Sequence, residues 1–239
     1  MEKIKQLQQI IDQSKRIVFF GGAGVSTESG IPDFRSADGL YHQKYKYNPE
    51  TILSHTFFIK KTAEFFEFYR DKMVVTNVSP NITHLFLAKL EQAGKLSGII
   101  TQNIDGLHQM AGSKKVTELH GSIHRNYCMN CHKFHPLSTV ANATEIPYCE
   151  CGGIIKPDVV LYEESLKEED INMALSLLAN ADTLIVAGTS LSVYPAASFL
   201  QYFTGTNVIL INKSATPYDK NADLLIQTGL GEVFSKLTI

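Results

Sequence analysis

Amide, carboxylate and imidazole side chains are concentrated in one short stretch of the sequence, between Thr101 and His108. A second histidine follows soon after, in the pair His120-Gly121. Such groups can hold a polar ligand and exchange protons with it. The stretch comes directly after an apolar run, residues 96–100, which predicts a buried strand. Because open α/β sheets bind ligands at the carboxyl ends of their strands, we predict a functional site here.

The apolar pattern predicts strands that alternate with helices along most of the chain. This alternation is typical of a doubly wound parallel sheet of the α/β class. Apolar residues at helical spacing also predict a short helix before the first strand. The predicted strands are 16–20, 96–100, 116–119, 159–162, 183–187, 208–211 and 224–226, and the predicted helices include 83–92 and 168–178.

Two stretches interrupt the alternation and predict a second, smaller lobe. The first, residues 38–78, is rich in aromatic residues and contains a predicted helix at 62–73. The second, residues 122–156, contains all the cysteines. We therefore expect the large domain to consist of residues 1–37, 79–121 and 157–239, with a helical insertion and a metal-binding module forming the small lobe.

Charge and hydropathy exclude several classes of protein. The 22 basic and 24 acidic residues are spread along the chain, so no basic surface for nucleic acid is indicated. We find no uninterrupted apolar span long enough for a membrane helix or a signal sequence. The expected location is the cytoplasm.

Four cysteines occur as two close pairs, Cys128 with Cys131 and Cys149 with Cys151. Paired cysteines in a reducing compartment favour a metal site over disulfides. Four thiolates fill the tetrahedral shell of zinc, so the ion would be structural. A redox-active pair is the weaker alternative, and His132 and His135 are possible substitute ligands.

A glycine-rich turn, Gly21 to Thr27, follows the first predicted strand. Glycines there allow backbone amides to approach a phosphate, although a generic tight turn would look the same. Small polar residues also follow two later strands, at 188–190 and 212–214, and favour a bound dinucleotide. No acidic residue closes a second strand as in dehydrogenases, so hydride transfer is disfavoured.

Taken together, these motifs resemble those of the sirtuins, the NAD-dependent protein-lysine deacylases. The resemblance spans nearly the whole chain, and its motifs occur in the family's order. It implies a Rossmann-like domain, a small lobe with a zinc ribbon, and NAD bound between the two. The matching motifs are Gly22 to Ser26, Ser29 to Arg35, Thr101 to His108, His120-Gly121, the four cysteines and Gly188 to Leu191.

The resemblance implies that NAD is consumed as a co-substrate in removing an acyl group from lysine. Nicotinamide leaves, and the acyl oxygen attacks the ribose carbon that it vacates. The positions that match the family's cofactor contacts are Gly22, Ala23, Gly24, Thr27, Asp33, Phe34, Arg35, Gln102, Asn103, Ile104, Asp105, Gly188, Thr189, Ser190, Asn212, Lys213 and Leu230.

Catalytic roles follow from the same resemblance. His120 matches the general base that activates a ribose hydroxyl, and imidazole titrates in a suitable range for this task. Asn103 and Asp105 match residues that position the nicotinamide. Phe34 matches an aromatic cover over the reactive carbon. We expect structural roles for the other histidines near the site, His84, His108 and His124.

Substrate recognition is implied by two segments that hold an extended peptide in sirtuins. They match Val159, Val160, Leu161, Tyr162 and Glu163 on one side and Leu191, Val193 and Tyr194 on the other. Main-chain pairing would make this recognition tolerant of peptide sequence. Sirtuins that prefer acidic acyl groups have a tyrosine and an arginine where this chain has Phe66 and Tyr69. A neutral acetyl group is therefore expected.

Two other functions stay open on the sequence alone. One is ADP-ribosyl transfer to a protein from the same NAD site. The other is an inactive NAD-binding sensor, which the presence of His120, Asn103 and Asp105 disfavours. The expected partners are acetyl-lysine proteins or peptides, with no nucleic acid and no membrane, and the expected oligomeric state is a monomer.

Overall fold

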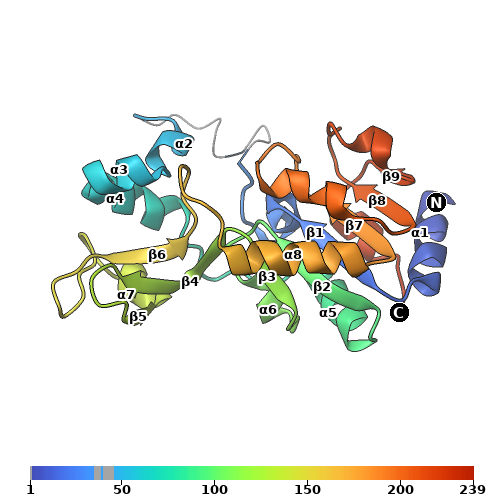
Figure 1. Cartoon of the computed structure of the whole chain (residues 1–239), viewed down its shortest axis with the longest axis horizontal. Helices are drawn as coiled ribbons and strands as arrows, with labels where there is room; N and C mark the ends of the chain where they lie inside the picture. Colours follow the sequence, from blue (N-terminus) through green and yellow to red (C-terminus); the bar gives the residue numbers. More distant parts are fainter. Residues whose placement is uncertain (1, 35–38, 40–45) are drawn as a thin grey trace.

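A six-stranded parallel sheet forms the centre of the molecule's larger part (Figure 1). The computed structural model describes residues 2–34, 39 and 46–239. The strands are β1 (Ile17–Gly21), β2 (Leu96–Thr101), β3 (Val116–Glu118), β7 (Thr183–Ala187), β8 (Asn207–Ile211) and β9 (Leu224–Ile226). They lie in the order β3-β2-β1-β7-β8-β9, and every neighbouring pair is parallel. The predicted doubly wound sheet is confirmed.

Helices cover both faces of this sheet because its strands are apolar on both sides. Phe19 of β1 packs into the core on one face, and its neighbour Phe20 into the core on the other. Among the described residues, no helix is both long and apolar enough to cross a bilayer. The first face carries α1 (Glu2–Gln13), α5 (Ile82–Gln92) and α9 (Leu230–Phe234), and the second carries α8 (Glu168–Asn180) and the 3-10 helix Ala196–Tyr202.

A smaller antiparallel sheet lies to one side of the parallel one, as Figure 1 shows. It consists of β4 (Gly121–Cys128), β5 (Phe134–Pro136) and β6 (Ile155–Val159), with β4 in the middle. The prediction of a strand at 159–162 in the parallel sheet is wrong, because β6 ends at Val159 and pairs with β4. Residues 160–161 are apolar for another reason: Val160 packs against the core of the parallel sheet and Leu161 is buried in that of the small lobe.

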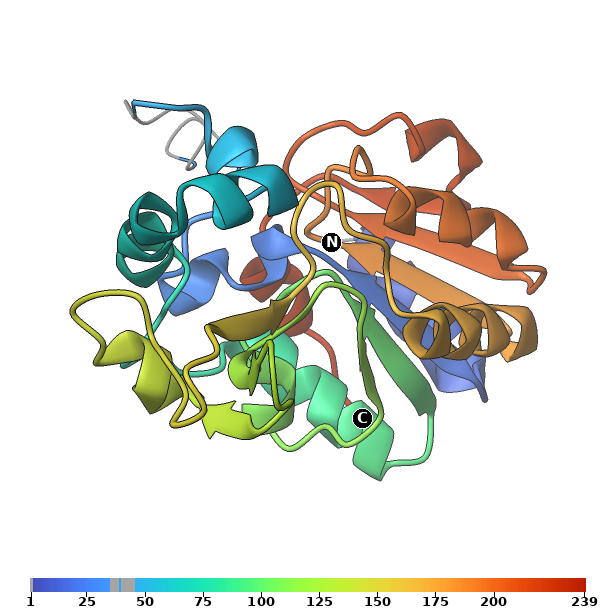
Figure 2. The ribbon, with the colours of Figure 1, turned by 60° about the vertical axis from the view of Figure 1, so that its left-hand side comes forward.

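Three helices of the first insertion pack with the small sheet around one core (Figure 2). They are α2 (Pro49–Ile52), α3 (His55–Lys60) and α4 (Thr62–Lys72), and α7 (Leu137–Ala141) belongs to the second insertion. Phe58, Phe65 and Phe66 meet edge to face at 5.0–6.0 Å in this core. Cys128 and Ile155 from the small sheet belong to the same cluster. The two insertions thus share a core, while the predicted domain boundaries stay predictions.

Two histidine rings are buried beneath the site. His108, in α6 (Leu107–Met110), is 1% exposed and packs edge to face against His84 at 4.7 Å. Neither ring nitrogen of His108 has a hydrogen-bond partner. Burial lowers the pKa of His108 to about 3 and that of His84 to about 4. Both imidazoles are therefore neutral in the folded protein at neutral pH.

We expect this pair to make the fold sensitive to mild acid. Since both folded pKa values lie below the unfolded value, the stabilisation is complete above about pH 6.5 and is lost as the pH falls toward the folded values. Between pH 7 and pH 5, each of the two rings should lower the free energy of unfolding by about 2 kcal/mol. We expect the free energy of unfolding in urea to fall from pH 7 to pH 5 by about 2 kcal/mol less in His108→Leu than in wild type. Equal losses in the two proteins would contradict this. Effects common to both, such as protonation of the cysteines, cancel.

Candidate active site

The carboxyl ends of four neighbouring strands place polar residues along one edge of the parallel sheet. Gly22 follows β1, Gln102 follows β2, Gly188 follows β7 and Asn212 follows β8. β1 lies between β2 and β7, where the order of the strands reverses along the chain. Ligands of doubly wound sheets bind in the crevice at such a switch point.

The glycine turn after β1 is packed against the loop that follows β7. The backbone N–H of Gly24 donates to the Gly188 carbonyl at 2.8 Å. A Cβ atom on Gly24 would lie 2.8 Å from the Cα atom of Gly188, so a larger residue would force the two loops apart. Gly188 itself has a φ of +59°, which favours glycine. The turn continues into two 3-10 helices, Ala23–Val25 and Thr27–Ser29.

Thr189 connects the ends of three strands. Its hydroxyl accepts from Gln102 Nε2 at 3.1 Å, and its carbonyl accepts from Asn212 Nδ2 at 2.5 Å. Ser190 and Lys213 beside it are exposed. The donors at these strand ends are hydroxyl, amide, ammonium and backbone N–H groups, which suit ribose hydroxyls and phosphate oxygens. Leu230 begins α9 with its side chain in the core, so only its backbone can face a ligand.

Asn103 and Asp105 are held by a serine of the glycine turn. Ser26 Oγ donates to Asp105 Oδ2 at 2.6 Å and accepts from Asn103 Nδ2 at 3.1 Å. Asp105 Oδ1 also accepts from the Leu107 N–H at 2.9 Å, which begins α6. Asn103 and Asp105 are 8% and 7% exposed. Ile104 lies between them, half-buried. Hydrogen bonds within the protein thus hold the side chains of Asn103 and Asp105 in place.

Ser26 is a site residue that the sequence prediction missed. The glycine motif includes Ser26, but the sequence does not indicate its contacts with Asn103 and Asp105. The signal was a hydroxyl directly after a glycine turn, but its partners are 77 and 79 positions away in the chain. Only the pairing of β1 with β2 brings them together.

His120 lies just beyond β3, with its ring held by one backbone carbonyl. His120 Nδ1 lies 2.9 Å from the Gln102 oxygen, which can only accept, so the proton of the neutral ring is on Nδ1. The lone pair is therefore on Nε2. Burial lowers the pKa of His120, although the bond to Gln102 opposes this. Gly121 follows with a φ of +76°, and a Cβ atom there would collide with the Asp158 carbonyl.

The first predicted substrate segment is tied to the protein on both sides. The Val160 N–H donates to the His120 carbonyl at 3.0 Å, and the Tyr162 N–H donates to the Leu53 carbonyl at 2.9 Å. Leu161 is buried, and Glu163 accepts from the Thr56 N–H at 2.9 Å. The first predicted substrate segment therefore begins beside the site histidine.

The second predicted segment follows the loop after β7. Leu191 is buried in the cluster against which Val160 of the first segment packs, and the Val193 carbonyl accepts from Ala197. Tyr194 is 74% exposed. Its contact with a peptide stays a prediction.

The loop after the glycine turn is described only in part. Asp33 and Phe34 are half-buried, and Phe34 packs against the small-lobe core. The predicted cofactor contact Arg35 lies outside the described residues. The role of Phe34 as a cover over the site stays a prediction.

The four cysteines form a compact cluster at the edge of the small lobe. Their sulfur atoms lie within 4.8 Å of one another, with Cys128 and Cys151 at 3.4 Å and Cys131 and Cys149 at 3.7 Å. Zn–S bonds of about 2.3 Å place the sulfurs of a tetrahedral site about 3.8 Å apart. The Cys131 N–H, together with that of Asn130, lowers the pKa of the Cys128 thiol to about 6. The cluster therefore fits a structural zinc ion.

Zinc removal should destabilise the small lobe. Since a structural zinc ion contributes folding free energy, we expect Cys149→Ser to lose its zinc and unfold at lower temperature. Metal analysis and thermal unfolding of purified protein measure both effects. His132→Ala is the matched control, because His132 neighbours the cluster but is not required by four thiolates; loss of zinc in that variant would contradict the four-cysteine site.

Comparison with known proteins adds a second line of argument. The model of the Sir2 family matches residues 22–195. A protein of Clostridium acetobutylicum named NAD-dependent protein deacetylase is 59% identical over 98% of this chain and 97% of its own. One of Clostridium tetani with the same name is 56% identical over 98% and 96%. A solved structure of Sir2 with a p53 peptide and NAD+ matches with a TM-score of 0.87 and 35% identity over 98% and 96% of the two chains. The chain belongs to the Sir2 family.

Proposed function

We propose that His120, Asn103 and Asp105 carry out the NAD-dependent protein deacetylation for which this chain's relatives are named. The chain is an NAD-dependent protein deacetylase, and peptides or proteins are its substrates. The observation that carries the proposal is the His120 ring, held by the Gln102 carbonyl at the strand ends beside the buried Asn103 and Asp105 pair. No other described histidine combines this position with a backbone-fixed ring and a free Nε2 atom.

The strand ends hold NAD in this proposal. Within the turn Gly22 to Thr27 and the loop Gly188 to Ser190, the backbone N–H groups that are not already bonded to other backbone groups bind phosphates, while Asn212 and Lys213 contact the far ribose. Asn103, Asp105 and the Ile104 backbone orient the nicotinamide, and Phe34 excludes water. When bound, NAD supplies nicotinamide as a leaving group and an electrophilic ribose carbon. Because Ser26 already fixes Asn103 and Asp105, little reorganisation accompanies binding.

His120 then acts as the proton acceptor. Its Nε2 atom takes the proton of a ribose hydroxyl, while Nδ1 remains bound to the Gln102 carbonyl. Burial keeps the pKa of His120 below its usual value, so the ring is neutral at physiological pH. The acetyl-lysine peptide lies as a strand between 159–163 and 191–194.

Clustered reduced cysteines favour a cytoplasmic location, and a monomer is proposed.

Replacement of His120 should strongly reduce turnover without abolishing cofactor binding. Loss of a general base typically costs about 10²- to 10⁴-fold in rate. We expect this loss in the kcat of His120→Ala, with ADP-ribose binding by calorimetry close to wild type. For wild type, kcat/KM should fall with acid only below pH 6.5, because the base must be neutral. Normal deacetylation by the variant would refute the assignment.

Release of nicotinamide separates deacetylation from the two alternatives. We expect release that depends on an acetyl-lysine peptide. Release without the peptide would favour ADP-ribosyl transfer or NAD hydrolysis, and NAD binding with no release would favour a sensor.

The acyl group should be small and neutral. Phe66 and Tyr69, at the positions that matter for acidic acyl groups, are fully buried in the small-lobe core. The neighbouring Arg70 donates to the carbonyls of Thr144 and Glu145, so its charge is already engaged. We therefore expect acetyl removal to exceed succinyl removal on one peptide sequence by at least about tenfold, since neither Phe66 nor Tyr69 supplies a cation for an acyl carboxylate. Faster succinyl removal in matched steady-state assays would contradict this.

A further inference from the structure

An irregularity interrupts β4 a few residues after His120. Ser122 pairs with Asp158 of β6, but Asn126 pairs with the next residue back along β6, Pro157. Three residues of β4 therefore have no opposing residue on β6. We call these residues, 123–125, the β4 bulge. Bulges redirect side chains, and they are common near active sites.

The first two residues of the β4 bulge contact the loop that follows β2. The Ile123 N–H donates to the Ile104 carbonyl at 3.0 Å, and His124 Nε2 lies 3.0 Å from the Asp105 carbonyl. A Cβ atom on Gly106 would lie 2.7 Å from the His124 ring. One side of the bulge is thus fitted closely to the Asn103 and Asp105 loop.

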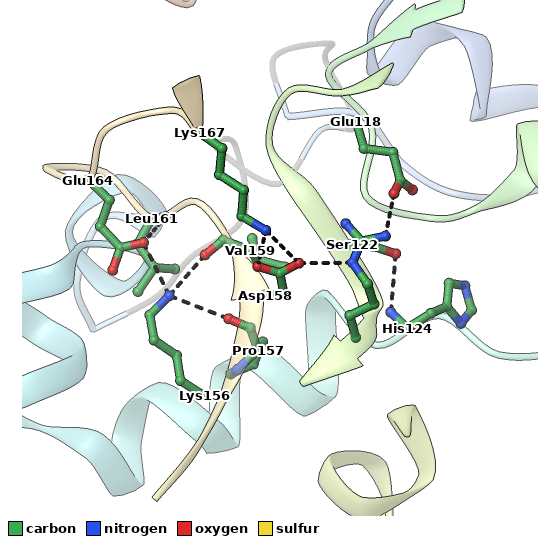
Figure 3. Close-up of polar contacts among 11 residues, drawn as sticks. Glu118, Ser122, His124, Lys156, Pro157, Asp158, Val159, Leu161, Glu164 and Lys167 are labelled. Atoms are coloured by element: carbon green, nitrogen blue, oxygen red, sulfur yellow. Dashed lines mark hydrogen bonds and ion pairs between the residues drawn. The ribbon is translucent and has the colours of Figure 1, made fainter. Parts of the chain in front are cut away.

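The third residue, Arg125, points to two carboxylates instead. Arg125 Nη1 donates to Glu118 Oε2 at 2.6 Å, and Nε donates to Asp158 Oδ2 at 2.9 Å. Lys167 Nζ reaches Asp158 from the other side, at 2.7 Å (Figure 3). The side chains of Glu118 and Asp158 are 8% and 13% exposed, whereas that of Lys167 is 50% exposed. Arg125, at 37% exposure, is the main neutralising charge for these two nearly buried acids because it bonds both, whereas Lys167 reaches Asp158.

One of the two acids lies just before His120 in the chain, and the other lies just before the predicted peptide-binding segment. Glu118 ends β3, and His120 follows two residues later. Asp158 directly precedes Val159, where the predicted peptide-binding segment starts. The two segments are also joined by β4–β6 pairing and by the bond from the Val160 N–H to the His120 carbonyl. The planar guanidinium adds a rigid connection with two directed hydrogen bonds.

We propose that Arg125 is a positioning residue, which through Glu118 and Asp158 fixes the His120 ring relative to the bound acetyl-lysine peptide. This inference rests on the proposed function of His120. Without the guanidinium, two nearly buried carboxylates would face each other with only an exposed lysine nearby, so β3 and β6 would separate. Small shifts of a catalytic group have large effects on rate.

ADP-ribose binding distinguishes positioning from a general loss of structure. Most of the proposed contacts of the ADP-ribose half lie at the ends of β1, β7 and β8, whereas Glu118 lies on β3 at the edge of the sheet. A positioning role predicts a defect in peptide turnover with intact ADP-ribose binding. A merely structural role predicts that both weaken together.

The experiment compares Arg125→Met, which keeps the aliphatic part of the side chain, with Arg125→Lys, which keeps the charge but lacks the planar guanidinium and its two directed hydrogen bonds. We expect Arg125→Met to lower kcat/KM for an acetyl-lysine peptide by about tenfold to about a hundredfold, through both kcat and peptide KM, with an unchanged Kd for ADP-ribose. Arg125→Lys should recover part of the loss. Should Arg125→Met not fold, Arg125→Lys decides by the same two measurements.

Lys167→Met is the matched control, since it removes the other cation of Asp158 from an exposed position. It should change kcat/KM by less than about threefold, because exposed ion pairs contribute little. Wild-type kinetics in Arg125→Met, or an equal loss of ADP-ribose binding, would overturn the proposal. An active His120→Ala variant would instead refute the proposed function, so the two failures are distinguishable.

Discussion

The pairing of β1 with β2 on one side and β7 on the other is the constraint on which the rest of the site depends. β1 is buried on both faces, so its position in the sheet is determined by apolar packing in two cores. That pairing places the glycine turn, Gln102 and Gly188 at one edge. The polar groups themselves contribute little to this arrangement; the apolar strands hold them together.

Burial at this edge has a consequence for the polar residues there. A buried polar group without a partner is costly, so the site residues satisfy one another. Ser26 connects Asp105 with Asn103, and Thr189 connects Gln102 with Asn212. The same burial keeps the imidazoles of His120, His84 and His108 neutral. A single physical condition therefore provides both a fixed geometry and a proton acceptor.

The strands β1, β7 and β8 could be predicted because each is a nearly continuous apolar run that ends in small or polar residues. The segment 159–162 could not be assigned in this way, since Val160 and Leu161 serve two different cores and the true strand ends before them. Ser26 and Arg125 also escaped prediction. Their partners depend on strand pairing and on the β4 bulge, which no local sequence pattern indicates. The four cysteines could be predicted as a metal site because their close spacing in the sequence is itself typical of one.

The zinc cluster and the substrate segment belong to one packing unit, although they are distant in function. Cys128 and Cys149 are buried in the same cluster as Leu161 and the phenylalanines of α3 and α4. Protein interiors are packed densely, so a change at the metal is transmitted to its neighbours. Because Leu161 lies in the predicted peptide-binding segment, we expect loss of the structural ion to loosen the packing of that segment as well.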